Sequence, residues 1–402
     1  MIDSMIDTLL NFASHGLSRS GWPGIALYLL VTTQLTIFTV TLYLHRSQAH
    51  RGVDFHPLVS HVLRFWSWLS TGMVTKEWVA VHRKHHANCE TEADPHSPQV
   101  LGIGKVFFQG AELYRVAAAN EGDLEKYGRG TPDDWLERHV YSKYPYLGVS
   151  LLMVIDLLLF GALGAAIWAV QMAWIPFWAA GVVNGVGHWW GYRNFETADT
   201  ATNLTPWGFW IGGEELHNNH HAFPSSARFA LRRFEFDVGW AVICGLQKIG
   251  LAKVLRVAPS LDIRPNVNLP DAETLKALLT HRFQAMTDYY KLVIKPTLRE
   301  EALSAGANLR KKLPRRLRRA LADGGRWLDS EARNRLDAAI EKRPGLRVVV
   351  DYRARLAALI EQRKPESALA ALQQWIREAE MSGNRLLAEY AARLKRYAVA
   401  RA

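Results

Sequence analysis

Cysteine is scarce in this 402-residue sequence, where only Cys89 and Cys244 occur. Two cysteines cannot form the several disulfide bonds that hold small secreted domains together, so nothing indicates an oxidising compartment. The chain also lacks internal repeats and low-complexity tracts, which excludes repeat architectures. No small-residue cleavage site follows its first apolar run, so we do not expect a removed signal peptide.

Negative charge is scarce in the C-terminal part. Residues 251–402 contain 31 Lys and Arg against 17 Asp and Glu, a net charge of +14, whereas residues 1–250 carry a net −3. A basic segment either binds nucleic acid or faces an anionic membrane. Because of the apolar sequence before it, we interpret residues 251–402 as a basic, helical cytoplasmic tail that binds no nucleic acid. Its most basic run, residues 310–321, fits a solvated helix face or contact with lipid headgroups.

Long apolar runs, by contrast, are present. Residues 24–44 contain no charge over 21 positions, enough to cross a bilayer core. Residues 147–170 and 172–190 are also of membrane length, and their proximity predicts an antiparallel hairpin of two spans. Residues 58–81 carry three charges, so we expect an in-plane or re-entrant amphipathic helix there. The 15 tryptophans are typical of a membrane interface.

Histidines gather in four short motifs. In "WVAVHRKHHAN" the positions i, i+3 and i+4 share one helix face, so the three imidazoles should point the same way. "EELHNNHHAFP" repeats this spacing, "HRSQAH" ends the first span, and "NGVGHWW" ends the last span one turn after Asn184. One metal ion takes four to six ligands, so nine imidazoles indicate two metals. The nine are His45, His50, His82, His85, His86, His188, His217, His220 and His221.

The context of these motifs resembles the membrane-bound fatty acyl desaturases, the di-iron proteins with three histidine boxes, and among them the stearoyl-CoA desaturase-like members of bacterial type. The resemblance covers roughly residues 25–245 and includes "HRKHHANCETEADPHSP", "HNNHHAFPSSARF" and "NGVGHWWGYRNFE". It implies that the nine histidines ligate two irons and that Asn184 acts through a water. His96 lies in a segment that the family does not use as a direct ligand.

The resemblance also implies a fold and a reaction. We expect an all-α integral membrane bundle, residues 1–250, with a cytoplasmic helical cap around the two metals, in a bacterial inner membrane. The reaction would insert a cis double bond, at the delta-9 position, into an acyl chain carried as a thioester or lipid ester. It would use O2 and two electrons from a separate ferredoxin or flavin reductase. The expected partners are this electron-transfer protein, the membrane lipid and the fatty acyl substrate.

Some features depart from the family or stay open. Trp78 matches a tunnel-lining tryptophan, but Ala180 replaces a threonine that helps to bend the substrate tunnel in mammalian members. No HPGG haem motif occurs in the sequence, so we expect no fused cytochrome b5 donor. Asp156 inside a span is a candidate functional residue or a helix contact. Three acids beside the histidine motifs are candidates to orient the ligands: Glu77, Glu214 and Glu215.

Two other functions remain open at this point. An alkane or fatty-acid hydroxylase of the same superfamily would use nearly the same metal ligands. A metal-binding or metal-transporting membrane protein would instead place its ligands along a path through the bilayer. Five histidines lie outside the motifs and should be ordinary surface residues: His15, His56, His61, His139 and His281.

Overall fold

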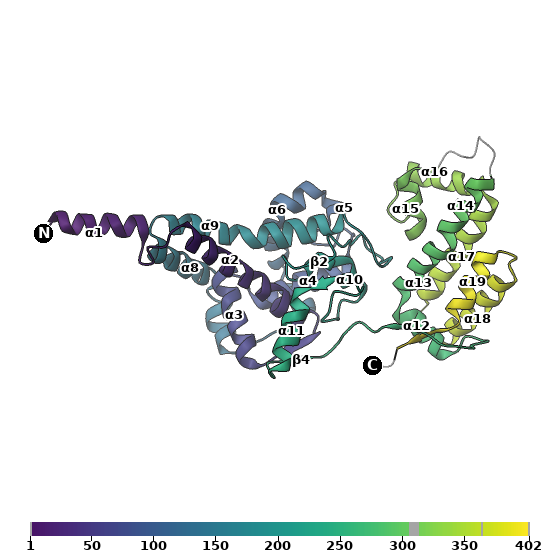
Figure 1. Ribbon diagram of the computed structural model, residues 1–402, viewed down its shortest axis with the longest axis horizontal. Helices are drawn as coiled ribbons and strands as arrows, with labels where there is room; N and C mark the ends of the chain where they lie inside the picture. Colours follow the sequence, from purple (N-terminus) through teal and green to yellow (C-terminus); the bar gives the residue numbers. More distant parts are fainter. Residues whose placement is uncertain (1, 305–312, 363–364, 401–402) are drawn as a thin grey trace. The chain divides into compact units, whose positions relative to one another are not determined.

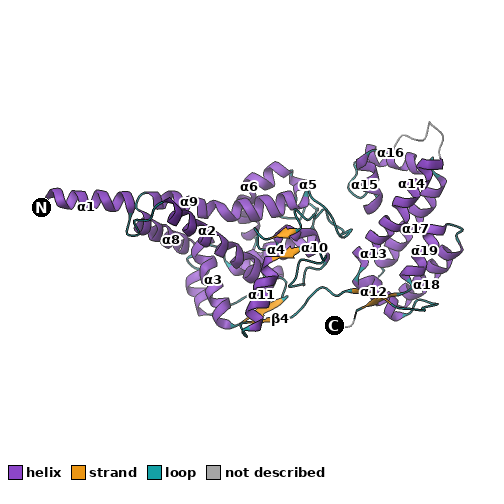
Figure 2. Ribbon diagram, in the orientation of Figure 1, coloured by secondary structure: helices purple, strands orange, loops and turns teal. Residues whose placement is uncertain are grey.

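The computed structural model describes residues 2–304, 313–362 and 365–400, which form a predominantly helical protein (Figures 1 and 2). Part of the basic run 310–321 lies outside the described residues. Two compact units can be distinguished. Unit 1 contains residues 1–193 and 199–258, and unit 2 contains residues 194–198 and 259–402.

Unit 1 is built mainly from helices of 14 to 17 residues, with shorter segments between them. Its helices are α1 (Ile2–His15), α2 (Trp22–Phe38), η1 (Thr39–Ala49), α3 (Pro57–Thr71), α4 (Thr75–Asn88), α5 (Pro98–Leu101), α6 (Ile103–Ala118), α7 (Glu121–Tyr127), η2 (Glu137–Tyr141), α8 (Pro145–Phe160), α9 (Leu163–Ile175), η3 (Pro176–Gly185), η4 (Val186–His188), η5 (Glu214–Leu216), α10 (His217–Ala222) and α11 (Val238–Lys248). Its strands form two short pairs, in which β1 (Val53–Phe55) runs antiparallel to β4 (Ala252–Val254) and β2 (Trp207–Gly208) runs parallel to β3 (Phe236–Asp237).

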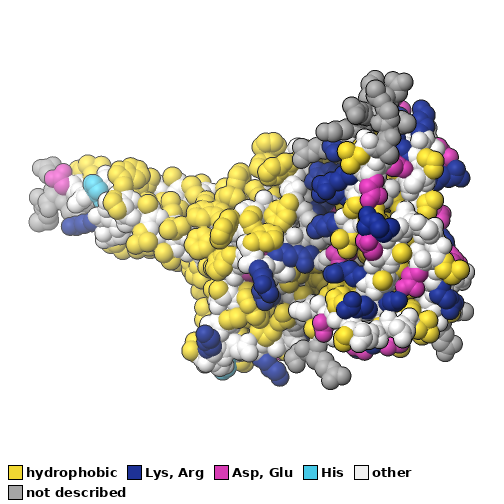
Figure 3. All heavy atoms as spheres, turned by 45° about the vertical axis from the view of Figure 1, so that its right-hand side comes forward, with side chains coloured by type: hydrophobic (Ala, Val, Ile, Leu, Met, Phe, Trp, Pro, Cys, Tyr) yellow, Lys and Arg dark blue, Asp and Glu magenta, His cyan; other side chains and the backbone are white. Residues whose placement is uncertain are grey.

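Two continuous helices of unit 1 are long and apolar enough to cross a membrane. They are Trp22–Ala49, which joins α2 to η1, and Leu163–His188, which joins α9, η3 and η4. The apolar helix α8 is shorter, at 16 residues. Hydrophobic side chains cover much of the visible surface of this unit (Figure 3). The span expected over residues 147–170 is thus shorter than predicted, because α8 ends at Phe160; α8 packs against α9 and α3.

The predicted hairpin boundary near residue 171 is wrong. The chain turns instead at Gly161, whose φ of +62° is a conformation that other residues adopt only with strain. A Cβ atom at Gly161 would lie 2.3 Å from the carbonyl oxygen of Ala13, and one at Gly164 would lie 2.2 Å from that of Asp156. Pro176 does not end the second long helix, because the helix widens into the π-helical segment η3 at that residue.

Residues 58–81 form two helices, although the charge pattern predicted one. The helix α3 ends at Gly72, which is left-handed with φ +65° and whose N–H donates to the carbonyl of Trp68. The next helix, α4, begins at Thr75 and carries the first HxxHH motif. The break turns α4 into a separate element, and α4 contacts η1 and α6.

The first long helix ends in the π-helical segment η1, and the second passes through the π-helical segment η3 and ends in the 3-10 segment η4. In η1 the N–H of His50 donates to the carbonyl of His45, five residues earlier, at 3.1 Å. A π-helix needs about 4.4 residues per turn, so residues five apart lie near one face, whereas on an α-helix they would diverge. The ring centroids of His45 and His50 are accordingly 4.9 Å apart. The π-helix therefore allows the two histidines of the HxxxxH motif to place their rings next to each other.

Unit 2 is a bundle of helices around an apolar core of its own. Its helices are α12 (Ala272–Thr280), α13 (Arg282–Tyr289), η6 (Tyr290–Ile294), α14 (Lys295–Ser304), α15 (Arg315–Asp323), α16 (Ser330–Glu341), α17 (Pro344–Ile360), α18 (Pro365–Met381) and α19 (Arg385–Leu394). Strands β5 (Leu261–Ile263) and β6 (Tyr397–Val399) pair antiparallel and join the beginning and end of the unit. His281, predicted to be a surface residue, is only 3% exposed, because its helix junction packs into this core.

Candidate metal centre

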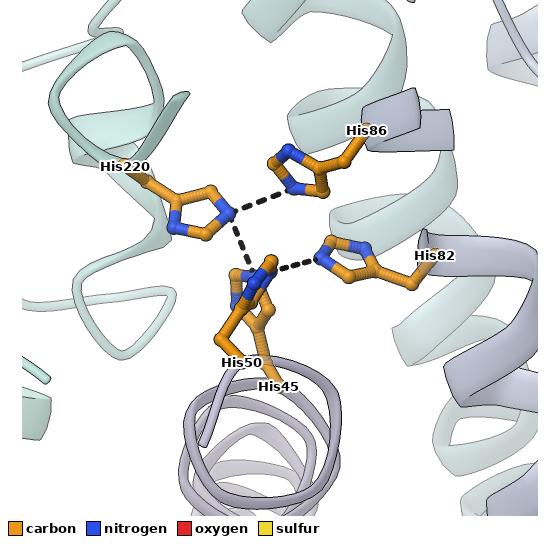
Figure 4. Close-up of side chains that lie close together, drawn as sticks. All are labelled: His45, His50, His82, His86 and His220. Carbon is orange, nitrogen blue, oxygen red and sulfur yellow. Dashed lines mark hydrogen bonds between the residues drawn. The ribbon is translucent and has the colours of Figure 1, made fainter. Parts of the chain in front are cut away.

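Five histidines from three segments meet in unit 1 and form the five-histidine group. Figure 4 shows their rings turned toward one another, with His82 and His86 on α4 and His220 arriving from α10. The Nε2 atom of His220 lies 3.0 Å from Nε2 of His45 and 3.0 Å from Nε2 of His86. The Nε2 atoms of His50 and His82 are 2.8 Å apart. One ligand nitrogen from each histidine lies within 4.8 Å of those of all the others.

Four further histidines, His85, His188, His217 and His221, form the four-histidine group by the same criterion. The Nε2 atoms of His188 and His217 are 2.9 Å apart. Both HxxHH motifs divide between the groups. In the first motif His82 and His86 belong to the five-histidine group and His85 to the four-histidine group. In the second motif His220 belongs to the five-histidine group, whereas His217 and His221 belong to the four-histidine group. The three imidazoles of the first motif lie close together on α4, with ring centroids 4.6 to 6.5 Å apart, and the motif contributes to both groups.

Four carboxylates hold the outer nitrogens of these rings. The Nδ1–carboxylate distances are 2.7 Å for His45 and Glu214, 2.9 Å for His85 and Asp94, 2.9 Å for His188 and Glu90, and 3.0 Å for His221 and Asp199. A carboxylate at Nδ1 favours the tautomer that leaves the lone pair on Nε2, as is typical of metal-ligating histidines. The buried Nε2 of His221 has no hydrogen-bond partner in the described part of the chain, as expected of an atom that awaits a ligand.

Sequence reasoning found only one of these carboxylates. Glu214 orients His45 as expected, whereas Glu215 accepts from the backbone N–H groups of Trp210, Ile211 and Gly213 and shapes their loop. Glu77 contacts none of the nine rings through a hydrogen bond that the structure describes. Asp94 carried a signal in the acidic segment after the first HxxHH motif. Glu90 and Asp199 carried none, because each meets its histidine through the fold.

Burial keeps most of these imidazoles neutral. Burial lowers the pKa of five of them well below the ordinary histidine value, and repulsion from neighbouring histidines lowers it further: His50, His82, His86, His217 and His220. Burial also brings the pKa of His221 down to about 4, although Asp199 opposes the shift. Burial alone would lower the pKa of His85 too, but Cys89 and Asp94 outweigh it and raise that pKa. Neutral imidazoles are the form that binds metal.

Two residues beside the four-histidine group add to its surroundings. His96 stacks on His85 with ring centroids 4.4 Å apart, and its backbone N–H donates to Asp94. Burial lowers the pKa of His96 to about 3, so this ring is neutral as well. The Sγ of Cys89 lies 3.6 Å from Nε2 of His85, so this thiol contacts the four-histidine group.

A cavity of about 660 Å³ is lined in part by the histidines. Its wall includes Trp78, Ala180 and Asn184, together with His45, His82 and His217. The remaining wall is mostly apolar and draws on α2, α6, α8 and α9. At Gly110 a Cβ atom would lie 2.5 Å from that of Ala180, so α6 and η3 touch along one side of the cavity. Trp78 and Ala180, the two expected tunnel residues, thus line the same cavity as three of the histidines.

Asp156 makes a helix–helix contact. The hydroxyl of Tyr28 on α2 donates to its carboxylate on α8 at 2.6 Å, and the side chain is fully buried. Next to this pair, the amide of Gln171 on α9 donates to Thr32. These polar contacts join three apolar helices, which gives Asp156 a structural role in unit 1.

Two groups of converging imidazoles beside a mostly apolar cavity could hold metal ions. Comparison with known sequences gives the family: residues 20–236 match the family model for fatty acid desaturase. The chain therefore belongs to the fatty acid desaturase family.

Individual relatives agree with this assignment. A probable chloroplastic lipid desaturase of Arabidopsis thaliana is 32% identical over 53% of this chain and 58% of its own length. The delta-9 acyl-lipid desaturase 1 of Arabidopsis thaliana is 31% identical over 58% of this chain and 74% of its own length. The sn-1 stearoyl-lipid 9-desaturase of Anabaena variabilis is 27% identical over 60% of this chain and 87% of its own length. The chain thus spans less than two thirds of the first of these relatives.

Proposed function

We propose that the protein is an O2-dependent fatty acyl desaturase with two irons held by the nine histidines. The reaction removes one hydrogen from each of two adjacent CH2 groups and reduces O2 to two waters with two external electrons and two protons. When bound, the irons would supply the activation of O2 and the oxidising power to break unactivated C–H bonds. The observation that carries the proposal is the junction of both histidine groups with one apolar cavity.

The donor set fits iron. All nine side-chain donors are imidazole nitrogens, which suit iron, zinc and copper, and they divide into sets of five and four. The smaller set leaves room for a water, which Asn184 would hold from the cavity wall. The residues we propose as ligands are His45, His50, His82, His86 and His220 for one iron, and His85, His188, His217 and His221 for the other.

The cavity would hold the acyl chain and exclude water from it. A narrow apolar tube fixes which carbon atoms come closest to the metals, so its shape decides the position of the double bond. Trp78 and Ala180 are the wall residues that we propose to act on this position, which we place at delta-9. Relatives that share this family include both acyl-lipid desaturases and an icosanoyl-CoA 5-desaturase of Limnanthes douglasii. The acyl carrier here is accordingly a lipid ester or a thioester.

The two long helices support a position in a membrane. His45 lies near the C-terminal end of Trp22–Ala49, and His188 ends Leu163–His188. The two histidine groups adjoin each other, with the rings of His86 and His221 4.4 Å apart, so we propose that both helix ends emerge on one side of a bilayer. We propose that this side is the cytoplasmic one, in a bacterial inner membrane, where a separate ferredoxin or flavin reductase can deliver the electrons.

Expression in a host that cannot make unsaturated acids tests the proposal. We expect a new cis double bond in the acyl lipids, formed only with O2, and none with the His82→Ala variant. The position of the double bond is read from the cleavage products by mass spectrometry. Hydroxylated acids as the main product would assign the protein to the hydroxylase branch. An iron-loaded protein that gives no oxidised lipid would refute the proposal.

A further inference from the structure

Arg46 follows a ligand of the five-histidine group directly and is only 1% exposed. All five of its N–H donors are used. Its two terminal nitrogens donate to the Asp237 carboxylate at 3.0 and 2.9 Å, and also to the carbonyls of Ala227 and Gly212 at 2.8 and 2.9 Å. Its Nε donates to the hydroxyl of Thr41 at 3.3 Å. A guanidinium with every donor satisfied holds its neighbours in one geometry.

Asp237 is held equally firmly from the other side. Besides Arg46, its carboxylate accepts from the backbone N–H of Phe229 at 2.7 Å and that of Trp240 at 2.9 Å. The second contact caps the N-terminus of α11, while β3 places Asp237 beside β2. The pair therefore connects the HRSQAH motif at the end of η1 with the segment that follows the HNNHH motif.

This pair reaches the ligands by two routes. The guanidinium carbon lies 3.8 Å from the centre of the Phe229 ring, and that ring lies 4.8 Å from His220 and 5.6 Å from His45. On the second route Thr41, which accepts from Arg46, donates to Glu214 at 2.6 Å. Glu214 in turn holds Nδ1 of His45 at 2.7 Å. Both routes end at the five-histidine group.

The four-histidine group has different supports. Its Nδ1 partners are Asp94, Glu90 and Asp199, and no hydrogen bond that the structure describes links these three to Arg46 or Asp237. Perturbing the Arg46–Asp237 pair should therefore move His45 and His220 and leave His188 and His221 in place.

We propose that Arg46 and Asp237 are positioning residues that set the separation of His45 from His220 and thereby the metal affinity of the five-histidine group alone. The proposal rests on the proposed function in taking both groups as metal sites. Arg46→Lys keeps the charge and removes the two-pronged contact, so the distance between the two segments can relax. Losing a residue that orients ligands typically weakens metal binding about 10–100-fold.

Titration of the metal-free, detergent-purified protein with Co2+ tests this without requiring catalysis. We expect two tight sites in the unaltered protein. In Arg46→Lys one site should weaken about 10–100-fold while the other keeps its affinity and its visible absorption spectrum. The matched control is Arg64→Lys, because Arg64 is also buried, pairs with Asp134 and Glu137, and contacts no histidine ligand. It should lower thermal stability without weakening either site.

Three results would overturn the proposal: equal weakening of both sites in Arg46→Lys, no weakening of either, or the same change in Arg64→Lys. Should Arg46→Lys fail to fold, Thr41→Val cuts the second route alone and must weaken the same single site. Unchanged affinities in Thr41→Val would then count against the proposal. A protein that binds two Co2+ ions but never oxidises lipid would leave this inference intact and refute the proposed function.

Discussion

The two units differ in what their interiors contain. Beside its apolar clusters, unit 1 buries six of the nine histidines and the four carboxylates that contact them, while His50, His82 and His86 are half-buried, so part of its interior consists of groups that cost free energy to remove from water. Unit 2 buries aliphatic and aromatic side chains, and its buried Tyr289 and Tyr390 satisfy their hydroxyls on the backbone carbonyls of Val349 and Ala285. The comparison shows that the buried polar groups that could hold metal ions lie in unit 1, while the described core of unit 2 is mainly apolar.

The largest expected effect is the loss of one ligand. His220→Ala or His82→Ala should abolish desaturation because each removes a nitrogen from the five-histidine group without altering a long apolar helix. Product analysis in the unsaturation-deficient host measures this, and membrane fractionation confirms insertion. The matched control is His281→Ala, which removes a buried histidine from unit 2. Product from either variant at more than a small fraction of the unaltered yield would exclude that histidine from the metal site.

A graded effect is expected at the end of the second long helix. His188→Ala should inactivate the protein, whereas Asn184→Ala, acting through a water, should lower activity about 10–100-fold. Parallel measurement of product and of bound iron separates the two variants. Total inactivation with lost metal in both would contradict the ranking.

The histidine motifs show most clearly which features of the site the sequence alone predicts. The nine histidines and their spacing predict two metals, and the family resemblance adds Asn184, Trp78 and Ala180, which line one cavity. The division of each HxxHH motif between two groups could not be predicted, because it depends on which rings approach from the opposite helix. His45 and His50 can contribute to the same group because η1 is π-helical, and no residue pattern in the sequence predicts a π-helix there.

The fold was predicted with similar gaps. Apolar length identifies the long helices, but the turn at Gly161 depends on close backbone approach to Ala13, which lies far away in the sequence. Glu90 and Asp199 lie 98 and 22 residues from their histidines. Only tertiary packing brings such pairs together, so the spacing of residues in the sequence does not predict them.

A smaller effect on activity is expected from the core of unit 2. Trp375 is 2% exposed, and its indole N–H donates to the carbonyl of Tyr352 at 3.0 Å. Trp375→Ala should destabilise unit 2 by about 3–5 kcal/mol, because it leaves a large cavity and an unpaired carbonyl. Calorimetry should record the loss, while the iron content per folded chain stays the same. Loss of iron in proportion to the lost stability would show that the two units do not differ as described.

The smallest effect concerns the exposed cations of unit 2. Lys291, Lys295, Arg299 and Arg318 form no side-chain ion pair among the described residues, and Leu303 nearby is 84% exposed. We predict that this surface binds anionic lipid, each cation contributing about 1 kcal/mol. Residues 259–402 should bind anionic vesicles in a salt-sensitive way and neutral vesicles not at all.

A matched variant tests whether vesicle binding depends on these four cations or only on the overall positive charge of unit 2. Replacing the four cations by Gln should abolish vesicle binding. Replacing four cations that already form ion pairs should not: Arg335, Arg347, Arg385 and Lys395. Equal loss in both variants, or no binding by the unaltered segment, would reduce unit 2 to a solvated appendage.

Metal content and product formation in one purified sample test the central claim most directly. The account predicts about two irons per chain, loss of O2-dependent double-bond formation when a chelator removes them, and recovery when Fe2+ alone is returned. Full activity with zinc in place of iron, or with a single metal per chain, would contradict it.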